Sequence, residues 1–168
     1  MISFSDISLV FPGGSVALSN VTTKVGDGEF IYLIGPSGSG KSSFLKIVYK
    51  ELEPTNGEVE VTGINLNSLA SWRVPLLRRK LGIVLQEPKL LKDRTVSENI
   101  SFAMEVLGFS PYEIKNQVNQ LLSLVEIENE AYKYPDQLSS GQQTRVAIAR
   151  ALASKPLVLL CDEPTGNL

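Results

Sequence analysis

A glycine-rich stretch with one lysine and one serine carries the clearest chemical pattern in this sequence. Residues 35–42 read G-P-S-G-S-G-K-S, which matches the phosphate-binding pattern G-x-x-x-x-G-K-S. Glycines allow the tight turn that points successive backbone N–H groups at one anion, and the start of a following helix adds further donors. In such a loop Lys41 reaches the β- and γ-phosphates of a nucleotide, and the Ser42 hydroxyl binds Mg²⁺.

Two acidic residues at the end of an apolar run form the second pattern. Asp162 and Glu163 follow residues 157–161, L-V-L-L-C, a run typical of a strand buried on both faces. Asp162 would hold Mg²⁺, directly or through water, and Glu163 would orient or deprotonate an attacking water. The alternative is a solvated acidic turn, which the phosphate-loop pattern in the same chain disfavours.

Other candidate residues are each compatible with a structural role. Gln86 ends the predicted strand 81–85, and ligands gather at the C-terminal ends of strands in open parallel sheets. Residues 138–142, L-S-S-G-Q, open a predicted helix and form either an anion site or a plain N-cap. Phe11, on a predicted turn, either stacks on a base or plugs a strand end. The basic residues 78–80 form a solvated helix face or contact an anionic membrane surface.

Strand and helix patterns surround these residues. Alternating or continuous apolar patterns predict strands over 2–10, 16–25, 30–34, 58–61, 81–85 and 157–161. Helix patterns cover 42–48, 70–80, 96–107, 110–125 and 143–153, and Ser110 to Glu113 reads as a capping box with proline at the first helical position. Strands with an antiparallel pattern therefore precede a βα unit. Before the last strand, a helical insertion breaks the alternation of strands and helices.

Composition limits the classes of function. A chain of 168 residues is long enough for one domain with a core. It contains no histidine, which excludes histidine acid–base chemistry and the common zinc sites within these residues. The net charge of −2 gives no basic footprint for nucleic acid. One cysteine, no long apolar run and no leader-like N-terminus together predict a cytoplasmic protein.

Over essentially its whole length the chain resembles the nucleotide-binding domain of ABC-type ATPases. Residues 138–142 resemble the LSGGQ signature, with Ser140 in place of its first glycine. This motif is the specific one, because phosphate loops are widespread. Gln86 matches the Q-loop glutamine, residues 159–163 the Walker B segment, and residues 164–168 the start of the D-loop.

The resemblance implies an α/β fold: a P-loop NTPase core with an N-terminal antiparallel β-subdomain and a helical signature subdomain. It implies a single ATPase domain over 1–168, with the core and β-subdomain in 1–86 and 155–168 and the helical subdomain in about 87–154. The family continues past the D-loop into another strand and a switch histidine. We therefore expect the C-terminal part of the core to be missing, and the 168-residue fragment to be unstable with weak or absent activity.

The resemblance also implies the site. ATP and Mg²⁺ are the expected cofactors, with Glu163 and Gln86 catalytic, and Ser42, Gln86 and Asp162 at the metal. Two copies would dimerise head to tail, with ATP between the phosphate loop of one and the signature of the other. The implied nucleotide-binding residues are Phe11, which would stack on adenine, and Gly35, Pro36, Ser37, Gly38, Ser39, Gly40, Lys41, Ser42, Ser43, Ser139, Gly141 and Gln142.

Two segments, 74–82 and 90–96, resemble FtsE, the cell-division ATPase that pairs with the membrane protein FtsX. This implies ATP-driven dimerisation coupled to an FtsX-like partner at the inner face of the cell membrane. The partner's coupling helix would contact the surface between Gln86 and about Glu105.

The main alternative is the ATPase of a lipoprotein-release or macrolide-export transporter. A DNA-repair ABC protein is disfavoured, because no coiled-coil or cysteine-rich insertion separates the phosphate loop from the signature, and no nucleic-acid partner is expected. A GTPase lacks support because no Asn-Lys-x-Asp guanine reader is present, and a kinase would not need residues 138–142.

Overall fold

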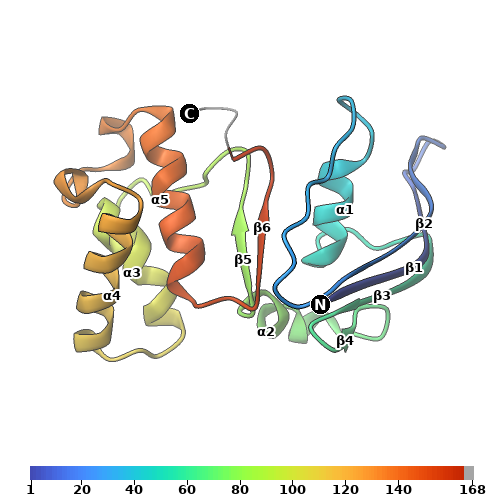
Figure 1. Cartoon of the computed structure of the whole chain (residues 1–168), viewed down its shortest axis with the longest axis horizontal. Helices are drawn as coiled ribbons and strands as arrows, with labels where there is room; N and C mark the ends of the chain where they lie inside the picture. The colour runs from blue at the N-terminus through green and yellow to red at the C-terminus, as the bar shows by residue number, and fades with distance from the viewer. Residues whose placement is uncertain (165–168) are drawn as a thin grey trace. The chain divides into compact units, whose positions relative to one another are not determined.

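The computed structural model describes residues 1–164, which form two compact units, Met1–Arg78 and the residues from Arg79 onward. The first unit holds a four-stranded sheet and the second a two-stranded sheet, as Figure 1 shows. Among the described residues, no helix combines the length and apolar character needed to cross a lipid bilayer.

An antiparallel sheet in the order β2-β1-β3-β4 builds the first unit. Its strands are β1 (Ile2–Val10), β2 (Val16–Val25), β3 (Asn56–Val61) and β4 (Ile64–Asn65). β1 lies between β2 and β3, and its alternating side chains Ile2, Phe4, Ile7 and Leu9 are buried. The predicted half-buried strand over 2–10 is therefore confirmed.

Helix α1 (Lys41–Val48) packs on this sheet. The Phe44 ring lies 4.2 Å from the Phe4 ring, centroid to centroid. At the N-terminal end of the helix, Gly40 has φ 90°. It lies so close to β2 that an added Cβ would stand 2.3 Å from the Ala17 carbonyl oxygen. Glycine is thus required at the entry to α1, for both conformation and space.

The predicted strand over 30–34 is not formed. Five consecutive apolar side chains there are exposed, from 41% at Leu33 to 92% at Ile34. The apolar pattern has strand character, but a strand also needs a hydrogen-bonded neighbour, and within residues 1–164 no strand pairs with this segment. A contiguous exposed apolar run of this kind is unusual on a soluble protein.

The second unit is built on two parallel strands, β5 (Leu81–Val84) and β6 (Val158–Cys161), paired from Leu81↔Val158 to Val84↔Cys161. Helix α5 (Ser140–Ala153) packs against β5. The approach is close at Gly82, where an added Cβ would stand 2.8 Å from the Ala151 carbonyl oxygen. This strand pair brings the residues that follow Val84 and Cys161 to one edge.

Helices α3 (Val96–Val106), α4 (Pro111–Leu124) and α5 pack together beside these strands, as Figure 1 shows. Val96, Ile100, Met104, Val118, Leu122 and Val146 belong to their shared core. The predicted capping box at Ser110 is confirmed, and Thr95 with Glu98 forms another. α5 begins three residues before the predicted position, because Ser139 caps it.

Four short elements complete the description. They are η1 (Ser71–Arg73), α2 (Val74–Arg78), η2 (Glu128–Glu130) and η3 (Pro135–Gln137). The first two occupy the predicted helical segment 70–80.

Asn99 on α3 organises the loop that precedes the helix. Its side chain is fully buried, and Oδ1 accepts from the Leu91 amide at 2.8 Å. Nδ2 donates to the carbonyls of Leu91, Arg94 and Thr95, each at 3.0 Å. One buried amide group therefore bonds to the backbone at three positions of the loop, Leu91, Arg94 and Thr95.

We predict that Asn99→Asp destabilises the protein by about 3 kcal/mol or more, because a buried carboxylate would face carbonyl oxygens in place of the amide donor. Urea unfolding followed by circular dichroism measures the loss. The matched control is Asn119→Asp on the exposed face of α4, for which we expect a change within about 0.5 kcal/mol. Equal effects of the two substitutions would contradict the structural role of Asn99.

Candidate functional site

The phosphate loop lies between residue 35 and the start of α1. Gly38 and Gly40 have φ 78° and 90°, in the left-handed region that favours glycine. Lys41 Nζ donates to the carbonyls of Gly35 and Pro36, both at 2.9 Å. The ammonium is therefore held at its own loop, next to a helix N-terminus, and this combination suits an anion.

The other loop residues predicted to touch nucleotide, Ser37, Ser39, Ser42 and Ser43, lie in the same turn and the first turn of α1. Ser37, Ser39 and Ser42 are exposed, and Ser43 is partly buried. The sequence pattern and the backbone geometry thus agree on a solvent-accessible loop that opens a helix.

Phe11 lies at the turn of the β1–β2 hairpin. Its amide donates to Ser15 O at 2.8 Å, and its carbonyl accepts from Gly14 N at 3.0 Å. The ring is 37% exposed, so it is not buried as a plug. Because β2 starts just after this turn and Ala17 contacts Gly40, the hairpin and the phosphate loop are close within the first unit.

Gln86 and Glu163 meet at the C-terminal edge of the second unit. Gln86 Nε2 donates to Glu163 Oε2 at 3.1 Å, although the residues are 77 positions apart. The parallel register explains the contact, because each residue lies two positions beyond the last strand pair, Val84↔Cys161. Both side chains are exposed, so this pair can hold and orient a water at the sheet edge.

Asp162 begins the acidic pair. Its amide donates to the Val84 carbonyl at 2.9 Å, which extends the strand pairing by one bond. Asp162 is partly buried, and the next residue, Glu163, has φ 49°. A left-handed residue directly after Asp162 therefore turns the chain at the end of the strand.

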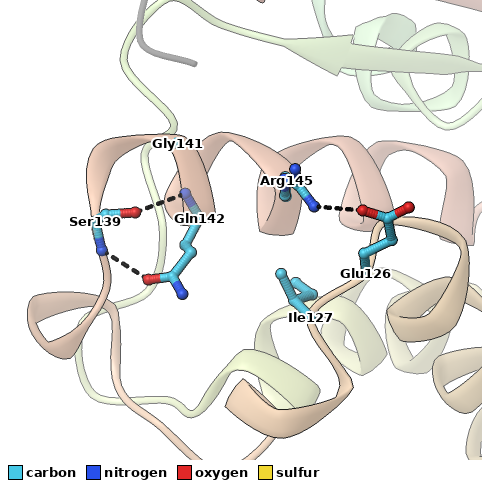
Figure 2. Close-up of a pocket in the computed structure, with 6 residues that line it drawn as sticks. All are labelled: Glu126, Ile127, Ser139, Gly141, Gln142 and Arg145. Carbon is cyan, nitrogen blue, oxygen red and sulfur yellow. Dashed lines mark hydrogen bonds and ion pairs between the residues drawn. The ribbon is translucent and has the colours of Figure 1, made fainter.

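The signature segment forms the start of α5 (Figure 2). Ser139 Oγ accepts from Gln142 N at 3.2 Å, and Ser139 N donates to Gln142 Oε1 at 2.9 Å. The backbone φ of Ser140 is not positive, so serine is accommodated where the family has glycine. Ser139 is exposed and the helix start faces an open pocket.

The pocket beside the signature has a volume of about 490 Å³, and three of its lining residues, Glu126, Ile127 and Arg145, were not found by sequence reasoning. Arg145 Nη1 donates to the Val125 carbonyl at 3.0 Å. It also pairs with Glu126 Oε2 at 3.3 Å, as Figure 2 shows. Arg145 could have been predicted, because it follows Gly141 by four positions and so shares its helix face. No such signal marks Glu126, which belongs to a distant turn.

The D-loop segment predicted over 164–168 lies outside the described residues, apart from Pro164.

Comparison with known proteins places this chain. The sequence model of the ABC transporter family matches residues 18–166. The chain belongs to this family. It is 44% identical over 168 residues to the cell division ATP-binding protein FtsE of Bacillus subtilis. This match covers 100% of this chain and 74% of that protein. FtsE of Escherichia coli is 42% identical over 168 residues, with 76% of that protein covered.

Solved structures support the same assignment. The dimeric structure of a post-hydrolysis state of the ATP-binding cassette MJ0796, bound to ADP and Pi, matches with a TM-score of 0.93 and 37% identity. The match covers 100% of this chain and 76% of that one. The predicted family and the ABC ATPase fold class are confirmed, and the activity of the chain is ATP hydrolysis.

Cys161, the single cysteine, ends β6 beside Asp162 and is solvent-accessible, while partial desolvation raises the pKa of its thiol. A raised pKa means less thiolate at a given pH, so alkylation of the folded protein should be slow at pH 8 and accelerate only at higher pH.

We predict that iodoacetamide reacts with the folded chain at least about threefold more slowly than with the urea-denatured chain at pH 8. Mass spectrometry of the alkylated fraction against time measures this ratio. Equal rates in the two states would contradict the desolvation of the thiol.

Proposed function

We propose that this chain is the ATPase of an FtsE-type complex, in which ATP-driven dimerisation acts on an FtsX-like membrane partner during cell division. The observation that carries this proposal is identity to proteins named FtsE along the whole chain. That identity is 44% for Bacillus subtilis, 45% for Streptococcus pneumoniae and 42% for Escherichia coli, each over 168 residues. The 47% identity to FtsE of Mycobacterium tuberculosis extends over 152 residues.

ATP binds in this proposal through the first unit. The phosphates occupy the loop 35–43, where backbone N–H groups at the start of α1 and the Lys41 ammonium offset their charge. Lys41 would exchange its bonds to Gly35 O and Pro36 O for phosphate oxygens. The exposed Phe11 ring offers a stacking face for adenine.

Hydrolysis uses the second unit. Glu163 takes a proton from the attacking water, and Gln86, which already contacts that carboxylate, orients the same water. Oxygen donors suit Mg²⁺, which keeps several waters and needs few protein ligands besides phosphate. The Asp162 carboxylate, the Gln86 amide oxygen and the Ser42 hydroxyl are of this kind. Mg²⁺ held by groups of this kind would offset the charge on the β- and γ-phosphate oxygens.

Dimerisation would complete the site. The N-terminal end of α5, where Ser139 is exposed and Gly141 and Gln142 line an open pocket, would bind a γ-phosphate held by a second copy. Similarity to the ATP-binding cassette MJ0796, whose solved structures are titled dimeric, supports two copies. ATP that bridges two subunits favours the closed dimer, and hydrolysis releases it.

A mixed apolar and charged face near α3 is the proposed contact for the membrane partner. The Arg94 guanidinium lies 5.1 Å from the Phe102 ring centroid and 3.7 Å from Glu105. Phe102 is 38% and Val106 50% exposed. Such a face suits an amphipathic helix, and contact with a membrane protein would place this chain at the inner face of the cell membrane.

A transporter ATPase is the second candidate. The methionine import ATP-binding protein MetN of Helicobacter hepaticus is 42% identical over 168 residues, as similar as some of the FtsE proteins. That match covers only 48% of the MetN chain. Transporters of the lipoprotein-release or macrolide-export type belong to the same alternative.

Glu163→Gln tests the ATP-driven dimer. We expect the variant to bind Mg-ATP but not hydrolyse it, so that it runs as a dimer in size-exclusion chromatography with light scattering, with turnover reduced at least about a hundredfold. Wild type should return to monomer as ATP is consumed. The control Glu60→Gln, on an exposed position of β3, should match wild type. A Glu163→Gln chain that remains monomeric with ATP would refute the dimer mechanism.

Phe102→Glu tests the partner face. We expect its affinity for membranes reconstituted with an FtsX-type protein to fall at least about tenfold, since a charge would enter the apolar contact. Tyr112→Glu, on α4 and 77% exposed, is the matched control and should bind as wild type does. Stronger binding to membranes with a methionine-type permease than to those with FtsX would favour the transporter assignment.

A further inference from the structure

Arg150, near the C-terminal end of α5, contacts the loop that carries Gln86. Its Nη1 donates to the Lys89 carbonyl at 2.9 Å and its Nη2 to the Pro88 carbonyl at 2.7 Å. Within residues 1–164 no carboxylate pairs with Arg150, and burial lowers the pKa of its guanidinium. The guanidinium thus donates to two neutral backbone oxygens, and both belong to the loop that carries Gln86.

The backbone at Lys89 is in the left-handed region, with φ 45°. A lysine adopts this conformation at a cost, because its Cβ crowds the following carbonyl. The planar guanidinium can donate to two acceptors at once, and here it takes the carbonyls on either side of the strained residue. Loss of these two bonds would leave the left-handed turn without this support.

The rest of the loop is fixed at its ends. Val84 is paired in β5, and Leu90 packs against the cluster of Val84, Ala147 and Ala151. Between them, the described chain gives residues 85–89 two other bonds. One is the solvent-exposed ion pair of Lys89 with Glu87, which contributes little to the stability of the loop. The second is the Gln86–Glu163 contact itself.

We propose that Arg150 is the positioning residue that holds Gln86 against Glu163. This inference rests on the proposed function, in which that pair orients the attacking water. Because Arg150 and Ser139 lie at opposite ends of the same helix, the placement of Gln86 follows any displacement of the signature. Arg150 acts through the carbonyls of Pro88 and Lys89 and does not touch the reacting atoms.

The chain offers a matched control for this arrangement. Arg78 Nε donates to Tyr49 O at 2.9 Å and Nη2 to Lys50 O at 3.1 Å, and Lys50 has φ 55°. The same arrangement therefore occurs in the first unit: an arginine donates to two successive carbonyls, the second of which belongs to a lysine in the left-handed region. Residues 49 and 50 have no role in the proposed hydrolysis.

The experiment compares Arg150→Met and Arg150→Lys with Arg78→Met. We expect hydrogen exchange of the backbone amides within 86–90, which exclude Pro88, to rise about tenfold or more in Arg150→Met and to stay unchanged in Arg78→Met. The kcat for ATP should fall about tenfold, with KM changed less than about twofold. Arg150→Lys, which keeps the charge and one donor group, should be intermediate and keeps the test usable if the methionine variant does not fold.

A second substitution separates loop positioning from simple packing of α5. Asparagine tolerates the left-handed region better than lysine, so Lys89→Asn in the Arg150→Met background should recover part of the lost kcat. A role of Arg150 confined to α5 packing would not be repaired at position 89.

Two results overturn the proposal: unchanged exchange of amides 86–90 in Arg150→Met, or a loss of kcat no greater than in Arg78→Met. If wild type hydrolyses no ATP, the proposed function fails by itself. The exchange data then test only whether Arg150 positions the loop. A selective rise in the exchange rate at 86–90 in Arg150→Met would support that role, and no rise would refute it.

Discussion

The parallel pairing of β5 with β6 is the interaction on which the acidic edge depends. Two four-residue strands, paired from Leu81↔Val158 to Val84↔Cys161, bring together segments that are far apart in the chain. Side chains alternate along a strand, so a slip of one residue would send Gln86 and Glu163 to opposite faces. The contact between these residues is therefore a consequence of register. A strand pair of this size alone would be marginal, and α5 packs against β5 and also contacts α3 and α4.

Features encoded by neighbouring residues were predictable from the sequence. The phosphate loop, the strand over 2–10 and the capping box at Ser110 each depend on a few adjacent positions, and the structure has them at those positions. Residues 30–34 show the limit of such reasoning. Their apolar pattern indicates a strand, yet pairing depends on a neighbour from elsewhere, which no local pattern supplies.

The contacts of Arg78 and Arg150 could not have been predicted for a related reason. Both side chains donate to backbone carbonyls, and every residue of the chain has a carbonyl. A carboxylate partner would have left a charge pattern to recognise, whereas a carbonyl partner leaves none. Tertiary structure alone shows that Arg150 contacts the loop that carries Gln86.

Gly82 has a mechanical consequence. Because Gly82 has no side chain, β5 approaches the backbone of α5 closely there: an added methyl would stand 2.8 Å from the Ala151 carbonyl oxygen. Soft side-chain layers absorb displacement, but a backbone contact does not, because close-packed interiors are hardly compressible. A sliding movement of α5 over β5 at this point would therefore require backbone atoms of the strand to move as well.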